Sequence, residues 1–212
     1  MGGDSRAGGR RTLIDSHTAT IARSAAVAIG GSTREERSLS LGQMMRRARR
    51  ARSMTPADLA RQLGREVTWI YGLEAGRRAP RLATVAEFSA ALDVAIDVFA
   101  LAYADPRRTS LIPIPPGSAP RAYEVDVRPD ALGAALRNWR GMRGLTQAAL
   151  AMMAAMHPKQ IGRLENGRSR APTIETIYRI AVALALADGE TGQREGSSVG
   201  VSVVVSLVRS YI

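Results

Sequence analysis

Residues 145–177 read LTQAALAMMAAMHPKQIGRLENGRSRAPTIETI and contain the local signals from which the fold can be predicted. Thr146 is a favourable helix N-cap, because its hydroxyl can accept a hydrogen bond from a free backbone N–H of the first turn. His157 would cap a second helix and Pro158 would begin it, since proline is favoured at the first helical position. Apolar residues recur at helical spacing along both segments. The stretch therefore predicts two short helices joined by a tight turn.

The same pattern occurs earlier in the chain, where residues 54–85 read MTPADLARQLGREVTWIYGLEAGRRAPRLATV. Aligned without a gap, residues 41–76 and 132–167 share 13 identities in 36 positions. After one inserted residue in the second copy, Pro80 corresponds to Pro172. An internal repeat takes precedence over local signals, because it sets the architecture. Each copy is predicted to consist of helices only, so the expected fold class is mainly α.

Composition and the repeat divide the chain into five parts. They are a flexible N-terminal arm (1–40), a first helical domain (41–104), a Pro-rich linker (105–130), a second helical domain (131–187) and a tail (188–212). The linker contains six of the ten prolines, which lock φ and remove a backbone donor, so no helix is expected there. Within the arm, a helix over residues 15–29 is the alternative to disorder.

Two short segments alternate apolar and polar residues, which is typical of β-strands. One covers residues 122–128 at the end of the linker, and the other covers residues 199–211 in the tail. An unpaired strand as apolar as the second one invites partners. We expect it to pair with the first strand in the same chain, or with its twin as the dimer contact of a homodimer. Monomer and homodimer therefore both remain open.

The charge and the motifs that are missing narrow the class of protein. The formal net charge is +11, with 10 cations and 6 anions in residues 41–104 and 8 cations and 2 anions in residues 131–186. This excess favours a polyanionic partner. There is no cysteine, there are two histidines, and neither a phosphate loop nor a nucleophile elbow occurs. We therefore expect no enzyme, no metal and no cofactor.

The hydropathy pattern contains no membrane signal. No run of about 18 apolar residues occurs, and the N-terminus lacks the basic start and apolar core of a secretory signal. We therefore expect a cytoplasmic protein without a membrane partner.

Both copies resemble the lambda-repressor/Cro (XRE) type of helix-turn-helix domain, over residues 41–99 and 132–186. The resemblance rests on the Thr cap, the Leu-Ala pair, the inward Ile and the Leu-Glu-x-Gly end of each copy. It implies two such domains in tandem, each placing its second motif helix in the major groove of double-stranded DNA. Ala155 stands where this family has a turn glycine, which costs stability without excluding the turn. In the first copy, Pro56 replaces the glutamine with which the family contacts phosphate.

The resemblance implies which side chains meet DNA. In the second copy, the base-reading candidates are Lys159, Gln160 and Arg163, because Lys and Arg recognise guanine and Gln recognises adenine. In the first copy they are Thr68 and Trp69, which can contact a thymine methyl or the sugar edge, or can form a protein-facing patch. The candidates for phosphate contact are Arg46, Arg50, Thr55, Arg77, Arg78, Thr146, Gln147, Arg168, Ser169 and Arg170.

Two pairs of charged residues recur in both copies. Arg49 with Glu74, and Arg140 with Glu165, occupy positions that form an ion pair in the family. The resemblance implies a structural role for them, in which the pair links the first helix of each domain to its recognition helix.

Taken together, these features favour a sequence-specific transcriptional regulator, a repressor rather than an activator, that binds double-stranded DNA. Family members with one motif dimerise on a palindrome, so two unlike recognition helices in one chain favour an asymmetric operator. Phage-type immunity repressors are the functional analogy. Such a protein would be associated with the nucleoid when bound to DNA. The alternative is a protein-interaction module, such as an antitoxin or adaptor, in which only the second domain binds DNA.

Overall fold

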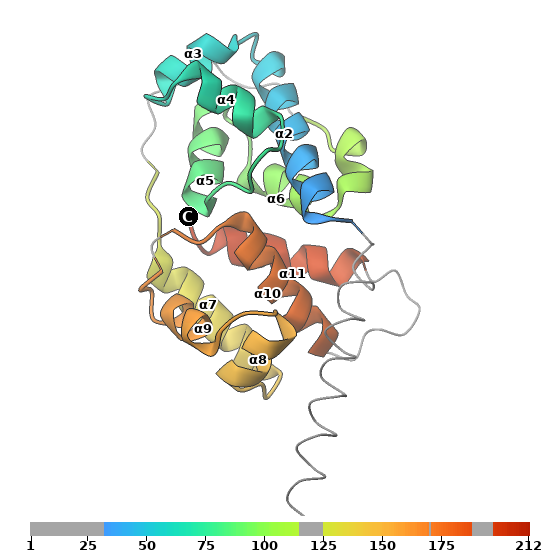
Figure 1. Ribbon diagram of the computed structural model, residues 1–212, viewed down its shortest axis with the longest axis vertical. Helices are drawn as coiled ribbons and strands as arrows, with labels where there is room; N and C mark the ends of the chain where they lie inside the picture. The colour runs from blue at the N-terminus through green and yellow to red at the C-terminus, as the bar shows by residue number, and fades with distance from the viewer. Residues whose placement is uncertain (1–31, 115–124, 170, 188–196) are drawn as a thin grey trace, which may run out of the picture.

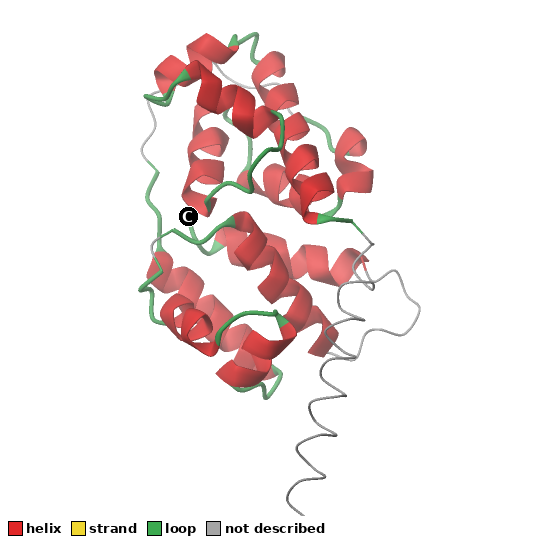
Figure 2. Ribbon diagram, in the orientation of Figure 1, coloured by secondary structure: helices red, strands yellow, loops and turns green. Residues whose placement is uncertain are grey.

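The computed structural model describes residues 32–114, 125–169, 171–187 and 197–212. Helices and loops make up this part of the chain, and no β-sheet occurs in it (Figures 1 and 2). The first half folds into α2 (Arg34–Ala51), α3 (Pro56–Gln62), α4 (Val67–Glu74), α5 (Leu82–Ala91), α6 (Ile96–Ala104) and the 3-10 helix η1 (Pro106–Leu111). The second half folds into α7 (Pro129–Met142), α8 (Gln147–Met153), α9 (Pro158–Glu165), α10 (Ile174–Ala187) and α11 (Ser197–Arg209).

Side-chain caps begin the short helices of both domains. Before α3, the Thr55 hydroxyl accepts from the Asp58 N–H at 3.1 Å, and the Asp58 carboxylate accepts from the Thr55 N–H at 2.9 Å. Before α9, Nδ1 of His157 accepts from the Lys159 N–H, and Oε1 of Gln160 accepts from the His157 N–H, both at 3.2 Å. These bonds satisfy N–H groups that have no partner within the helix.

Residues with left-handed backbone make the tight turns between the first helices of each domain. The turn after α3 places Gly64 at φ 61°, and the equivalent turn after α8 places Ala155 at φ 50°. The turn after α2 places Ser53 at φ 54°, and the equivalent turn after α7 places Gly144 at φ 60°. Each copy therefore has a glycine in one of these turns and a residue with a Cβ in the other.

The apolar core runs through both domains. Its fully buried members include Met44, Met45, Leu59, Ile70, Val85, Phe88 and Phe99 from the first domain, and Leu132, Leu136, Leu150, Ile161, Ile177, Ile180 and Leu184 from the second. Two equivalent glycines allow the first helix of each domain to cross the recognition helix closely. A Cβ on Gly42 would lie 2.5 Å from the Leu73 carbonyl oxygen, and a Cβ on Gly133 would lie 2.5 Å from that of Leu164.

The strand predicted over residues 199–211 is wrong, because the described chain forms α11 there. The buried side chains of this helix are Val203, Val204, Leu207 and Val208. They recur at the helical spacing of three and four residues, so that they share one face. The tail is so rich in valine that its apolar positions satisfy both the alternating and the helical pattern, and packing against α6 and α10 selects the helix.

The strand predicted over residues 122–128 is also not present in its described part, residues 125–128. Its expected partner strand is a helix, and Val125 and Val127 instead pack singly against the core. The expectation that the Pro-rich segment holds no helix is wrong at both ends. Pro106 begins η1 and Pro129 begins α7, since proline is tolerated in the first turn.

The first helix begins earlier than the composition suggests. Thr33 caps α2 by accepting from the Glu36 N–H at 3.1 Å, so the last part of the predicted arm is helical. The rest of the arm, including the alternative helix over residues 15–29, lies outside the described residues, as do residues 115–124 of the linker and 188–196 of the tail.

The two domains pair through backbone hydrogen bonds just before α5 and α10. The Leu82 N–H donates to the Pro172 carbonyl at 2.8 Å, and the Ile174 N–H donates to the Pro80 carbonyl at 3.0 Å. The result is an isolated antiparallel bridge between segments that are 92 residues apart in the chain.

Helices α6 and α11 pack against each other across the same junction. Nε of Arg209 in α11 lies 2.8 Å from Oδ1 of Asp97 in α6. The C-terminus is held as well, because the Arg128 N–H donates to the Tyr211 carbonyl at 2.6 Å.

A polar cluster on the other side of the junction joins α2 to α10. Nη2 of Arg37 donates to both carboxylate oxygens of Glu175, at 3.2 and 3.0 Å. The same guanidinium lies 4.1 Å from the ring centroid of Tyr178, and the Tyr103 hydroxyl donates to Glu175. Burial and the adjacent carboxylate raise the pKa of Tyr103, which keeps its hydroxyl a donor. The domains are therefore joined by polar and apolar contacts together.

Candidate nucleic-acid interface

Helix α9 buries one face and exposes the other. Ile161 and Leu164 are buried against the second domain, whereas Lys159, Gln160 and Arg163 are exposed. The three side chains predicted to read bases therefore share the outer face, within about one helical turn. Two cations and an amide in this arrangement supply the donors that suit guanine O6 and N7, and the paired donor and acceptor that suit adenine.

Helix α4 presents a different surface. Thr68 is exposed, but Trp69 is half-buried, and its ring centroid lies 6.0 Å from that of Phe88. The Arg65 guanidinium lies 5.4 Å from the Trp69 ring centroid. The structure thus places Trp69 against the core of the first domain. Tyr71, which is not among the predicted base-reading residues, is the aromatic side chain that α4 exposes, at 56%.

The two recognition helices differ at every position that the sequence predicts to face outward. The equivalent residues are Thr68 and Lys159, Trp69 and Gln160, Tyr71 and Gly162, and Gly72 and Arg163. Helix α4 therefore has no cation where α9 has two. Tyr71 occupies one of these outward positions, and its counterpart in the second copy is a glycine without a side chain.

Most of the phosphate candidates are exposed around these helices. The exposed ones are Arg46, Arg50, Arg77, Arg78, Arg168, Thr55, Thr146 and Gln147, and Ser169 is half-buried. Thr55 and Thr146 use their hydroxyls as N-caps, accepting from the N–H groups of Asp58 and Ala149. Arg170 lies outside the described residues.

A bidentate ion pair joins the first helix of each domain to its recognition helix. Nε and Nη2 of Arg49 lie 2.6 and 2.8 Å from the two carboxylate oxygens of Glu74, and Nη1 donates to the Met54 carbonyl at 2.7 Å. The second domain repeats these bonds, from Arg140 to Glu165 at 2.6 and 3.0 Å and to the Leu145 carbonyl at 2.7 Å. Each arginine thus ties three segments of its domain together.

Glu165 has a further partner in the glutamine at the start of α8. Nε2 of Gln147, a predicted phosphate contact, donates to Glu165 at 2.7 Å. Burial alone would raise the pKa of Glu165, but hydrogen bonds from Arg140 and Gln147 outweigh burial and lower it. The hydrogen bond to Glu165 raises the pKa of Arg140 in turn. The pair is therefore charged on both sides and fixes the orientation of α9.

A second, more exposed arginine stands beside each of these carboxylates. Arg46 lies 4.0 Å from Glu74 and Arg137 lies 3.9 Å from Glu165, and both side chains are 55% exposed. One carboxylate cannot neutralise two guanidinium groups, so a positive charge remains next to each recognition helix. Arg137 belongs to this set by geometry, although it is not among the predicted contacts.

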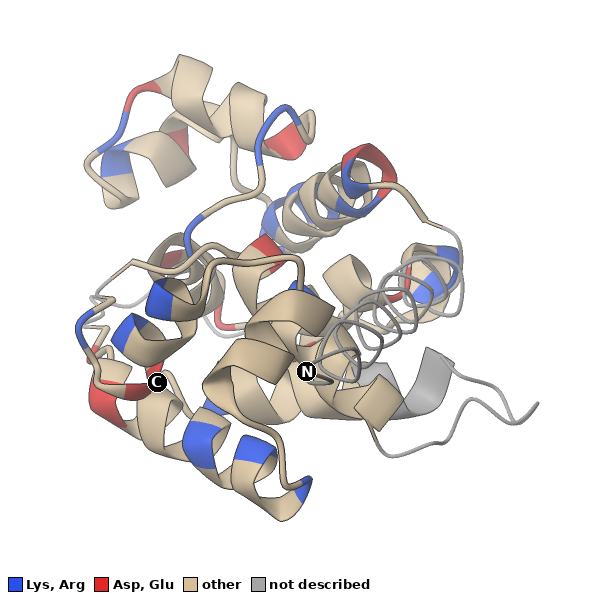
Figure 3. Cartoon of the chain, turned by 60° about the horizontal axis from the view of Figure 1, so that its bottom comes forward, with Lys and Arg blue, Asp and Glu red and all other residues tan. Residues whose placement is uncertain are grey.

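Charge is spread over both domains, with Lys and Arg on several helices (Figure 3). The described residues contain no cluster of side chains that could hold a metal ion. None of the described helices is long and apolar enough to cross a bilayer.

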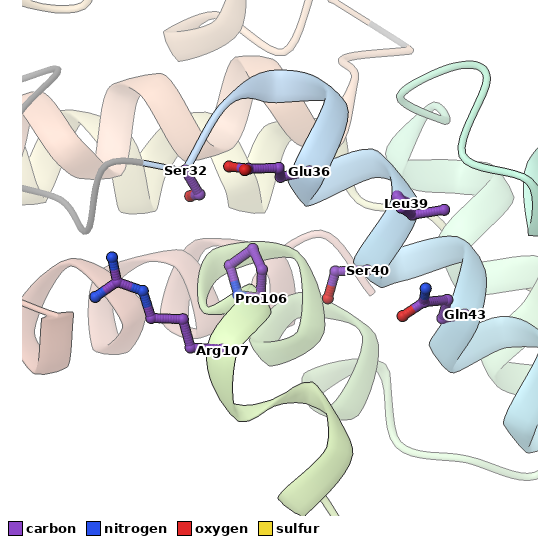
Figure 4. Close-up of a pocket in the computed structure, with 7 residues that line it drawn as sticks. All are labelled: Ser32, Glu36, Leu39, Ser40, Gln43, Pro106 and Arg107. Carbon is purple, nitrogen blue, oxygen red and sulfur yellow. The ribbon is translucent and has the colours of Figure 1, made fainter.

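A surface pocket of about 330 Å³ lies between the start of α2 and η1 (Figure 4). Its lining includes Glu36, Arg107 and Leu39, so it combines charges of both signs with an apolar side chain. The residues predicted to contact DNA are not among those that line it.

Comparison with known proteins agrees with this geometry. A family described as "Helix-turn-helix" matches residues 136–187, and one described as "Helix-turn-helix domain" matches residues 40–101. No curated protein and no solved structure matches the chain.

Proposed function

We propose that this chain, which carries two XRE-type helix-turn-helix DNA-binding domains in tandem, is a transcriptional repressor with a two-part operator. The observation that supports the proposal is the pair of recognition helices, each held by the same ion pair and each exposing a different set of side chains. Each half of the operator is read by one helix. The operator is therefore asymmetric in base sequence.

The half-site opposite α9 contains guanine and adenine. Lys159 and Arg163 donate to guanine, and Gln160 pairs with adenine. The half-site opposite α4 is read through Thr68 and Tyr71, by contacts with thymine methyl groups and sugars. Because the α4 contacts lack charge, this half-site discriminates less strongly between bases.

The proposed repressor role rests on the two DNA-binding domains themselves. Nearly all of the described residues belong to the two DNA-binding domains and their junction. Two domains that both bind the operator can exclude other proteins from it, which is the action of a repressor.

Selection of duplexes from a randomised pool by the full chain, over a series of salt concentrations, tests the proposal. We expect one enriched motif with two unlike halves, and an affinity that falls steeply with salt because counterions are released from phosphates. Lys159→Ala and Arg163→Ala should each weaken binding by about 1–3 kcal/mol and relax base preference in one half only. Arg107→Ala removes an exposed cation from η1, which is not among the predicted DNA contacts, and is the matched control. A pool without any enriched motif contradicts sequence-specific regulation.

A second function, a protein-interaction module in which only the second domain binds DNA, is favoured by one observation. Helix α4 exposes Tyr71 and no cation at its outward positions, which suits a protein surface as well as DNA. Under this alternative, Tyr71→Ala and Thr68→Ala leave the selected motif and its affinity unchanged. Under the proposed function, both substitutions weaken binding to the half-site opposite α4.

A further inference from the structure

The bridge between the domains has an internal symmetry. Arg81 and Thr173, the two bridged residues, are equivalent in the repeat, as are the residues on either side of them. Each segment donates from the residue after the bridge and accepts at the residue before it, at 2.8 and 3.0 Å. The operation that exchanges two antiparallel segments bonded in this reciprocal way is a two-fold rotation.

The same rotation relates the domains, because each segment is attached in the same way to an equivalent set of helices. In Figure 1, a half-turn in the plane of the picture about the junction brings α2, α3, α4 and α5 onto α7, α8, α9 and α10. Helices α4 and α9 lie on the near side of the molecule, one at each end. Helices α6 and α11 depart from the symmetry, since within its own domain α6 packs mainly on α2, whereas α11 packs mainly on α10.

This departure holds the arrangement in place. The contact between α6 and α11 joins the domains, and Phe99 of α6 and Val204 and Val208 of α11 are fully buried. The ion pairs of Arg209 with Asp97 and of Arg37 with Glu175 hold it at two further points. The recognition helices are therefore fixed to each other, and a flexible tether between the domains does not set their spacing.

We propose that a single chain binds a duplex whose two half-sites are inverted about a dyad at one fixed spacing, as a homodimer would, while the bases in the two halves differ. This rests on the proposed function. A DNA duplex has dyads perpendicular to its axis, and a protein with a two-fold axis binds with the two aligned. Half-sites in direct repeat are related by a translation and rotation along the duplex, which the domain arrangement does not match.

Contacts with the DNA backbone and contacts with the bases differ in symmetry in this arrangement. Two arginines beside each recognition helix recur in both copies, in the pairs Arg46 and Arg137, and Arg77 and Arg168, whereas Arg50 and Arg78 correspond to Gly141 and Ser169. The two recurring pairs meet phosphates symmetrically about the dyad. The outward residues of α4 and α9 are unlike, so the bases are read asymmetrically.

Tethered cleavage of DNA tests the orientation of the half-sites. The chain contains no cysteine, and Ala57 and Ala148 are equivalent, identical and exposed residues in the first turns of α3 and α8. Ala57→Cys and Ala148→Cys, each carrying a DNA-cleaving iron chelate, form a matched pair. The probe is the duplex that the full chain recovers from the randomised pool.

We expect the cleavage pattern of one variant on one strand to recur with the other variant on the opposite strand, at the same distance from the centre of the site. The same pattern displaced along one strand overturns the inverted arrangement and leaves the proposed function standing. Recovery of no duplex overturns the proposed function and the inference with it. Reversing one half-site of the recovered duplex should lower the affinity about 100-fold, because the domain opposite that half-site can no longer bind it while the other domain is bound.

A distance measurement tests the fixed arrangement without DNA. Spin labels on the double variant Ala57→Cys with Ala148→Cys should give one narrow distance distribution that DNA does not change. A broad distribution in the free protein, which narrows on binding, overturns the fixed arrangement.

Discussion

Ala155 and Gly64 occupy the same turn of the helix-turn-helix motif, one in each domain, with left-handed backbone. An L side chain in this conformation costs about 1 kcal/mol, because Cβ approaches the following carbonyl oxygen. Ala155→Gly should therefore raise the free energy of unfolding by about 1 kcal/mol. Thermal or urea unfolding followed by circular dichroism measures the change.

Gly64→Ala is the matched control, and it should have the opposite sign. A Cβ at Gly64 would meet no atom within 4 Å, so the substitution changes only the backbone energy. If both substitutions move the unfolding midpoint in the same direction, the turn geometry is not what limits stability at these positions.

Glu165 makes the stability of the second domain depend on pH. Its pKa is lowered in the folded protein, so protonation favours the unfolded chain. The stability contributed by the charged form is complete above the ordinary carboxyl pKa of about 4.3 and is lost as pH falls through the lower value of the folded state. Glu165→Gln should therefore cost about 2 kcal/mol at pH 7 and progressively less in acid.

The difference in unfolding free energy between the wild type and Glu165→Gln, taken over a pH series, isolates this group from the other carboxylates. Glu66→Gln, at an exposed residue that makes no side-chain cap bond, serves as the control and should cost almost nothing. A difference that stays constant down to pH 3 would show that the Glu165 charge does not support the fold.

At the scale of elements, α11 is decided by which valines are buried. Val204 is fully buried although an alternating strand would turn it outward, whereas Val201 is only half-buried. Val204→Ala should lower the free energy of unfolding by about 2 kcal/mol, and Val201→Ala by less than about 1 kcal/mol. Urea unfolding of the two variants compares them directly. A larger loss of unfolding free energy for Val201→Ala than for Val204→Ala would contradict the helix and favour the strand.

The helix-turn-helix elements could be predicted from sequence because several local signals agree. Thr55 and Thr146 are equivalent caps in the two copies, and Pro56 and Pro158 each begin a helix in one copy. The C-terminal helix could not be predicted in this way. Its valines and serines fit both periods, and the choice between them depends on contacts with helices far away in the chain.

Part of the candidate interface could likewise not be predicted from the sequence. The outward position of Lys159 follows from its place beside buried Ile161, and the structure places it there. The half-burial of Trp69 depends on Phe88, which lies in another helix, and no periodicity within α4 reveals it. The bond between Gln147 and Glu165 likewise depends on how α8 and α9 cross.

At the scale of the whole molecule, the junction between the two domains is the feature that the sequence predicts least well. Its central bonds are between backbone groups near Pro80 and Pro172, where side-chain type carries little information. Arg37 and Glu175 are 138 residues apart and belong to no motif. The repeat nevertheless indicates that the domains can pair, since two equivalent domains in one chain can contact each other as two chains would.

The number of chains in the protein–DNA complex, together with the bases they protect, shows whether one chain reads the whole operator. Native mass spectrometry of the full chain on its selected duplex gives the number of chains per duplex, and footprinting of the same complex gives the protected bases. We predict one chain per duplex with both half-sites protected. Two chains per duplex, or protection confined to the half-site of α9, would contradict the claim that one chain reads the whole operator with both domains.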